Sequence, residues 1–140
     1  MATVPPILLS IIACERGVLD KFSGMGFING IIQTINAPNY PARHARIVFF
    51  AELTDGHGQV NGIVKLVDIK EEDKVIFEQP IQIKFDNVKQ IQNLVCDLQG
   101  LVFPHEGEFR FQLWIEEHLL GERRIICRKI EFPKKGANNV

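Results

Sequence analysis

Histidines and carboxylates are the residues best suited to acid–base chemistry in this sequence. The densest cluster is Glu116, Glu117 and His118, and a second one pairs Asp55 with His57. Hydrolysis needs paired carboxylates, or a nucleophile with a base within reach. Both clusters also have the composition of polar loops, and isolated histidines carry little specificity. We therefore expect no catalytic residues and no enzymatic activity, and a hydrolase built on either cluster is the weakest hypothesis.

No pattern in the sequence predicts a metal ion or a cofactor. The acidic turn formed by Asp68, Glu71, Glu72 and Asp73 could hold a calcium ion, but it lacks the glycine and the closing glutamate of a calcium-binding loop. The segment GMGFING (24–30) resembles a phosphate-binding fingerprint, but the β-branched residues after it do not predict the required helix. The cysteines are far apart and never spaced C-x-x-C, which favours buried, reduced thiols; they are Cys14, Cys96 and Cys127.

Trp114 is the residue least explained by packing. In the segment EFRFQLWI (108–115), strand alternation places four apolar side chains on one face and Arg110, Gln112 and Trp114 on the other. An aromatic side chain beside arginine on a sheet face is typical of interface anchors. A second layer covering this face would explain the tryptophan equally well. We take Arg110, Gln112 and Trp114 as the candidate interaction surface.

The elements that must position these residues are strands. Apolar or alternating runs rich in β-branched and aromatic residues recur between turns. Residues 45–54 have one wholly apolar face, and DGHG (55–58) predicts a hairpin that pairs the strands beside it. Pro80 predicts an edge strand, and a bulge is expected in the last strand, residues 123–132, since either register of that strand buries an arginine. About eight strands predict an all-β, two-sheet antiparallel β-sandwich of immunoglobulin-like architecture, with a closed or partly open β-barrel as the alternative.

The most apolar stretch is PPILLSIIACERG (5–17), which resembles an export signal with a lipid-attachment cysteine. It has no basic residue before its apolar run, and the run is too short to span a bilayer. A buried strand that ends at the charged turn 15–17 is the favoured interpretation. Cys14 is then a small buried apolar side chain, and an aspartate at Leu8 or Leu9 should unfold the domain.

Length and charge limit the partners. At 140 residues the chain suits one domain, 1–140, whose last residues, 133–140, form a polar tail. Lys and Arg total 16 against 17 acidic residues, a net charge of −1, which attracts neither nucleic acid nor anionic lipid. We expect no nucleic-acid partner and no membrane association. Unpaired cysteines favour a cytoplasmic location.

Several segments together resemble a bacterial family of small all-β proteins that is known only as a domain of unknown function. The segments are the opening strand with Cys14-Glu15, GFINGI (26–31), NYP (39–41), FAELTDGHGQ (50–59), Asp68 after its strand and GEFRFQLWIEE (107–117). The resemblance spans nearly the whole chain. It implies a compact sandwich without a signal peptide, and it supplies no activity.

These observations favour a non-enzymatic module that binds a protein partner or associates with itself. The motivation is the absence of catalytic spacing, combined with Trp114 and exposed strand edges. The alternative is a sandwich that binds a small ligand or a carbohydrate, using Tyr40, Trp114 and the loops at one end.

Overall fold

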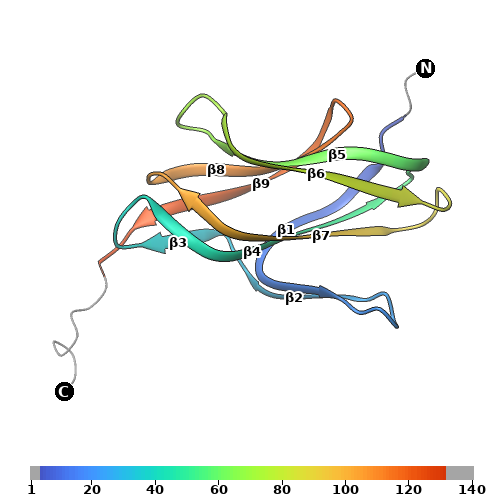
Figure 1. The fold of residues 1–140 in the computed structure, drawn as a ribbon, viewed down its shortest axis with the longest axis horizontal. Helices are drawn as coiled ribbons and strands as arrows, with labels where there is room; N and C mark the ends of the chain where they lie inside the picture. The colour runs from blue at the N-terminus through green and yellow to red at the C-terminus, as the bar shows by residue number, and fades with distance from the viewer. Residues whose placement is uncertain (1–3, 132–140) are drawn as a thin grey trace.

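The computed structural model describes residues 4–131 and contains nine strands in two sheets (Figure 1). Sheet A has the strand order β2-β1-β4-β7, and sheet B has the order β3-β9-β8-β5-β6. The all-β sandwich is confirmed, with one strand more than expected, and the predicted tail 133–140 lies outside the described residues. The strands are β1 (Ile7–Leu19), β2 (Gly26–Ile31), β3 (Thr34–Ala37), β4 (Ala42–Thr54), β5 (Gly58–Asp68), β6 (Lys74–Phe85), β7 (Gln92–Phe103), β8 (Gly107–Ile115) and β9 (His118–Lys129).

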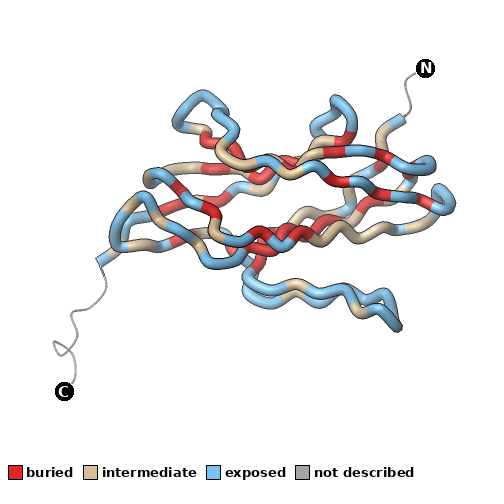
Figure 2. The backbone as a smooth tube through the Cα atoms, in the orientation of Figure 1, coloured by how far each residue is buried: buried red, intermediate tan, exposed pale blue. Residues whose placement is uncertain are grey.

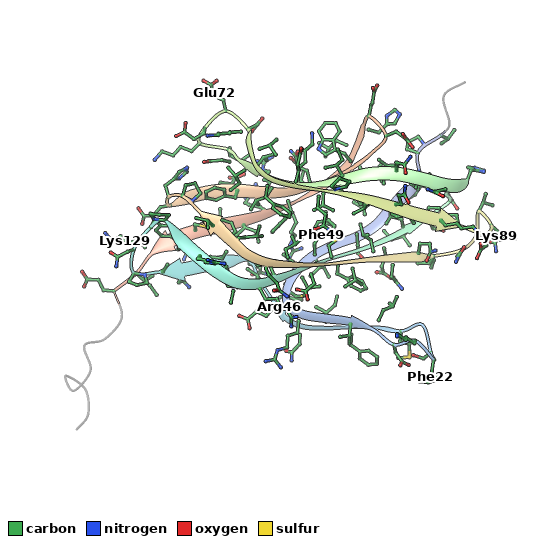
Figure 3. The ribbon with its side chains drawn as sticks, in the orientation of Figure 1. Phe22, Arg46, Phe49, Glu72, Lys89 and Lys129 are labelled. Atoms are coloured by element: carbon green, nitrogen blue, oxygen red, sulfur yellow. The ribbon has the colours of Figure 1, made fainter. Side chains whose placement is uncertain are left out.

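The core lies between the sheets, where the apolar faces of facing strands meet (Figure 2). Phe49 of β4 and Phe111 of β8 form part of this contact, with ring centroids 5.9 Å apart, and Figure 3 shows Phe49 between the layers. The apolar faces predicted from alternation are confirmed, because every member is at most 1% exposed; they comprise Ile47, Phe49, Ala51 and Leu53 on β4 and Phe109, Phe111, Leu113 and Ile115 on β8.

The segment DGHG crosses between the sheets, so the hairpin predicted there is wrong. Asp55 and Gly58 do adopt positive φ angles of 59° and 62°, as such turn residues favour. However, β4 belongs to sheet A and β5 to sheet B. β4 and β5 each have an apolar face, and when they lie in opposite sheets both apolar faces are buried in the core between the sheets. Gly56 allows the crossing, since a side chain there would overlap the ring of Phe85.

The first strand runs further than expected and leaves the sandwich together with β2. Glu15 and Arg16, predicted to end the strand, lie inside β1, which continues to Leu19. From Cys14 onward β1 pairs antiparallel with β2, after its first half has paired with β4. We call this two-stranded ribbon, residues 14–31, the β1–β2 arm. Figures 1 and 2 show the arm as a mostly exposed layer that lies over the outer face of β4, on the side away from sheet B.

Two glycines let the arm lie close to the outer face of β4. A Cβ at Gly26 would stand 2.7 Å from the ring of Phe50, and one at Gly17 would stand 3.0 Å from a methyl group of Val48. Val48 and Phe50 point away from the core, yet they are only 2% and 4% exposed. The arm therefore covers an apolar patch that the second sheet does not reach.

Sheet B contains the one parallel pair among the described strands. β3 runs parallel to β9, with Ile35 opposite Cys127, so the antiparallel prediction is wrong for this pair. The chain crosses from the arm in sheet A to the far edge of sheet B between β2 and β3. A connection of this kind leaves no sequence signal, because β3 is only four residues long. Pro80 lies on the edge strand β6, as predicted.

The last strand begins earlier than expected, at His118, and the predicted bulge is present near its start, before the range 123–132. Leu113 lies opposite Gly121, whereas Trp114 lies opposite Leu119, so the register of β8 and β9 shifts between them. Beyond the shift, Ile125 and Cys127 face the core, and no arginine of β9 is buried.

Neighbouring leucines at the start of β1 should respond differently to substitution. Leu8 packs against the core and fills the space over Gly121, whereas Leu9 is 50% exposed. We expect Leu8→Asp to lower the free energy of unfolding by about 2–5 kcal/mol, because it buries a charge and empties packed volume. The expectation that Leu9→Asp also unfolds the domain is wrong, because this side chain is half exposed; the variant should change the free energy of unfolding by less than about 0.5 kcal/mol. Urea denaturation monitored by Trp114 fluorescence measures both, and equal losses would contradict this packing.

Candidate functional site

Arg110, Gln112 and Trp114 lie side by side on the outer face of sheet B. They alternate along β8 with the apolar residues that face the core, as the sequence predicts. Gln112 is 9% exposed, although nothing from the opposite sheet covers this face, and Arg110 and Trp114 are half-buried. Neighbouring side chains on the same face therefore provide the burial.

A continuous hydrogen-bond network joins the three residues. Trp114 Nε1 donates to Gln112 Oε1 at 2.9 Å, and Gln112 Nε2 donates to Glu122 Oε1 at 2.6 Å. Arg110 donates to Glu122 Oε2 at 3.0 Å and to Glu108 Oε2 at 2.6 Å. The hydrogen bond to Glu108 is the main cause that raises the pKa of Arg110. The side chains are held in fixed rotamers, so this surface is preorganised.

Lysine completes the surroundings of the tryptophan. Lys65 of β5 places its Nζ 4.8 Å from the centroid of the Trp114 ring, a cation–π contact. The indole N–H and one ring face are thus already engaged within sheet B. Lys65 and Glu122 cannot be found from the sequence alone, because only the pairing of β8 with β5 and β9 brings them to Trp114. The surface is a charged, internally satisfied patch and not an open aromatic anchor.

The clusters considered for acid–base chemistry do not converge. Glu116 has a φ of 54° in the turn between β8 and β9, and its carboxylate accepts a hydrogen bond from the backbone N–H of Asn61 at 3.2 Å. Asp55 and His57 lie in the connection between the sheets. Within residues 4–131, no group of three or more His, Cys, Asp or Glu side chains is arranged to hold a metal ion. Apart from His118, the first residue of β9, the members of these clusters lie in turns or connections.

Tyr40 and Trp114, considered together for ligand binding, lie near opposite ends of β9. The Tyr40 hydroxyl is 2.7 Å from the carbonyl oxygen of Arg128, whereas Trp114 pairs with Leu119. Nine residues of extended strand separate the two ends, which is about 30 Å. One small ligand cannot contact both aromatic side chains.

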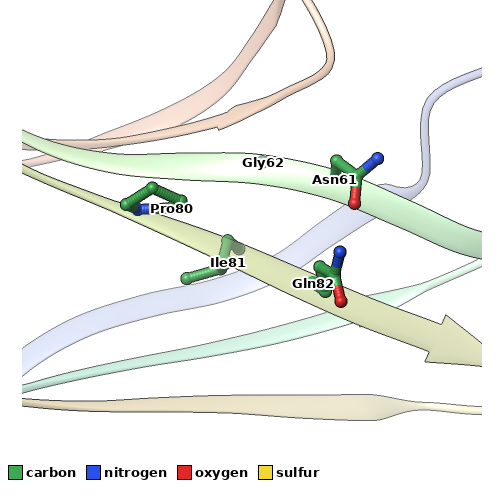
Figure 4. Close-up of a pocket in the computed structure, with 5 residues that line it drawn as sticks. All are labelled: Asn61, Gly62, Pro80, Ile81 and Gln82. Carbon is green, nitrogen blue, oxygen red and sulfur yellow. The ribbon is translucent and has the colours of Figure 1, made fainter.

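A shallow pocket of about 500 Å³ lies instead at the edge formed by β5 and β6 (Figure 4). Asn61 and Gln82 are register partners across the two strands, and both side chains are exposed. Pro80 supplies an apolar surface beside them. Amide side chains next to a flat apolar ring can hydrogen-bond a polar ligand.

His105 and Asp68 form an ion pair that the sequence did not reveal. His105 Nε2 lies 2.6 Å from Asp68 Oδ2, and Nδ1 faces the carbonyl oxygen of Glu106. Asp68 is 1% exposed, and its Oδ1 has no hydrogen-bond partner in the described part of the chain. Both ring nitrogens face oxygen acceptors, which favours the doubly protonated ring. The Glu106 carbonyl is the main cause that raises the pKa of His105; burial lowers this pKa, and Asp68 raises it further. Asp68 is thus a buried partner and not part of the acidic turn.

Exposed apolar side chains gather on the β1–β2 arm. Val18 and Phe27 are register partners on the ribbon face that points away from β4, and they are 61% and 51% exposed. Phe22, at the tip of the arm, is fully exposed and points into solvent in Figure 3. This surface was not predicted, because its apolar runs have the same composition as core strands. The exposed set comprises Val18, Leu19, Phe22, Met25, Phe27 and Ile31.

The ion pair predicts a pH dependence of stability. Folding raises the pKa of His105, so protonated His105 stabilises the folded state. This contribution to the free energy of unfolding is complete below the ordinary histidine pKa of about 6.5, and it is lost as the pH rises through the pKa of His105 in the folded state. His105→Gln should therefore lower the free energy of unfolding more at about pH 6 than at about pH 8. Urea titrations at both values measure this, with His57→Gln, at an exposed site, as the control. A deficit that grows with pH would contradict the assignment.

Comparison with known proteins gives a family and no activity. No helix in residues 4–131 is long and apolar enough to cross a membrane. No curated protein matches the chain. The model of a family of unknown function, DUF6941, matches residues 9–128, a span that takes in all nine strands almost to their ends. The chain therefore belongs to the family of unknown function DUF6941.

Proposed function

We propose that this chain is a non-enzymatic, cytoplasmic β-sandwich that binds another protein or a second copy of itself through the β1–β2 arm. The observation that carries the proposal is the exposure of Val18, Phe22 and Phe27 on a ribbon outside the sandwich. Soluble proteins rarely leave contiguous apolar patches uncovered, and such patches mark interaction sites. Burying each of these side chains contributes about 1.5–3 kcal/mol.

The arm suits docking because its two faces differ. One face carries Gly17 and Gly26 and packs on Val48 and Phe50. The opposite face presents Val18 and Phe27 to solvent, in a shallow hollow of about 420 Å³. The first face fixes the ribbon in place, so a partner meets an ordered surface and loses little conformational entropy on binding.

The surface formed by Arg110, Gln112 and Trp114 supports binding less strongly than the arm does. Its hydrogen-bonding groups satisfy one another, so a partner would displace existing bonds before it forms new ones. Charged side chains are typical of the polar rim of a protein interface and are rare at its centre. We place it second as a docking surface.

Three free cysteines support the cytoplasmic part of the proposal. All three are buried and unpaired. Burial raises the pKa of Cys96 to about 11 and that of Cys127 to about 12. Such thiols stay protonated at neutral pH and behave as apolar side chains, which suits a reducing compartment.

Site-specific photocrosslinking in extracts of the native cell tests the docking surface. A benzophenone amino acid replaces Phe27 on the arm, Arg124 on the outer face of sheet B, or Val102 on β7; the last two are 63% and 49% exposed. We expect a discrete crosslinked protein, or a crosslinked second copy, from position 27 alone. Crosslinks from position 124 but not from 27 would transfer the function to the Trp114 surface, and no crosslinks from any position would overturn the proposal.

A small-ligand role is the second candidate, and the pocket beside Asn61 and Gln82 is the observation that favours it. Its polar groups suit a sugar or a similar hydroxylated ligand. A ligand that binds only the folded state raises the melting temperature. We expect such a shift with a binding sugar to disappear in Asn61→Ala/Gln82→Ala. No shift across a panel of sugars and metabolites would exclude this role.

A further inference from the structure

The free edge of β2 lacks the protection that the other sheet edges have. Edge strands expose unpaired backbone N–H and C=O groups, and proteins guard them with charges, prolines or short length. Among the described residues, β2 pairs with β1 alone and so forms one edge of sheet A. Its sequence, GFINGI, contains no charged residue and no proline. β2 therefore offers an open template for another strand.

Each of the three remaining edges is guarded. β6 carries charged side chains and Pro80. β7 carries Asp97, which is paired with Arg46 at 2.8 Å. β3 is only four residues long. Among the edges formed by the described strands, β2 alone has a neutral, proline-free sequence of more than four residues, and it lies in the exposed apolar arm.

We infer that β2 pairs antiparallel with β2 of a second copy of this chain, an inference that rests on the proposed docking function of the arm. A twofold axis through the two strands would join sheet A of both copies into one continuous sheet. Such an interface is isologous, because each copy contributes the same patch.

Charge favours a second copy as the partner on this edge. In a twofold antiparallel pair, a residue at the axis faces its own equivalent, so any charge near the axis meets a like charge and destabilises the pair. The neutral sequence of β2 avoids this conflict, whereas Asp97 would create it on β7. The net charge of −1 adds almost no repulsion between the copies.

One register also matches the side chains. With the axis at Asn29, the two Asn29 amides face each other, and each can donate to and accept from the other. Residues two positions away then pair across the axis, so Phe27 lies opposite Ile31 of the second copy. Aromatic side chains opposite β-branched ones stabilise antiparallel pairs. Phe27 and Ile31 are 51% and 54% exposed in the single chain, and Val18 extends the same stripe.

Sedimentation equilibrium of the purified chain over about a hundredfold range of concentration tests the inference. The wild-type protein should form a dimer. Asn29→Asp and Asn29→Lys each place like charges about 5 Å apart at the axis, so each variant alone should associate about tenfold more weakly or worse. An equal mixture of the two variants should restore the dimer, because opposite charges then meet. Asn36→Asp, an exposed position on the β3 edge, is the matched control and should dimerise normally.

Circular dichroism confirms that each variant is folded, as expected for substitutions at an exposed side chain. A monomeric wild-type protein, a dimer unaffected by Asn29→Asp, or a mixture that fails to associate would each overturn the inference. A monomeric wild type that still crosslinks another protein from position 27 would leave the docking function standing and refute only the second copy. No crosslink from that position would instead remove the docking function itself.

Discussion

Burial of β4 on both of its faces is the constraint on which the rest of the molecule depends. Ile47 and Phe49 face sheet B, while Val48 and Phe50 face outward and need a cover of their own. A two-layer sandwich covers only the first face. The curled first strand and β2 provide the missing layer, and glycines at their underside allow the close approach. The inner face of the arm covers β4, and the outer face of the arm is left exposed.

The two sheets treat their outer faces in opposite ways. Sheet B presents charged and amide side chains that bond to one another around Trp114. On sheet A, the arm covers the apolar side chains of Val48 and Phe50, and Val18 and Phe27 on the outer face of the arm are exposed instead. Hydrogen bonds that are already satisfied give little free energy to a new partner, whereas uncovered apolar area gives more. This difference, more than the presence of an aromatic residue, decides which face is suited to binding.

Local patterns in the sequence predict the features that depend on neighbouring residues. Alternation identified the core faces of β4 and β8 and placed Trp114 outward, and Pro80 marked an edge. The turn residues of DGHG gave the right backbone angles but the wrong connection, because a turn does not specify which sheet receives the next strand.

Features that depend on residues distant in sequence were missed. Lys65 and Glu122 reach Trp114 only through strand pairing. The exposed side of the arm has the same apolar composition as a core strand, so only the fold separates the two. The pairing of His105 with Asp68 likewise joins segments that are 37 residues apart in the chain.

The position of β4 between β1 and β7 also sets an order of assembly. The hairpins β1–β2, β5–β6 and β8–β9 join neighbours in sequence, so they close quickly, whereas the pairs β1–β4 and β4–β7 of sheet A join strands separated by long stretches of chain. During synthesis β1 leaves the ribosome well before β4 and β7, which complete its surroundings. Until then its apolar residues, together with those of β2, face solvent. Val18 and Phe27, which remain exposed in the folded chain, are therefore exposed at every stage of its assembly.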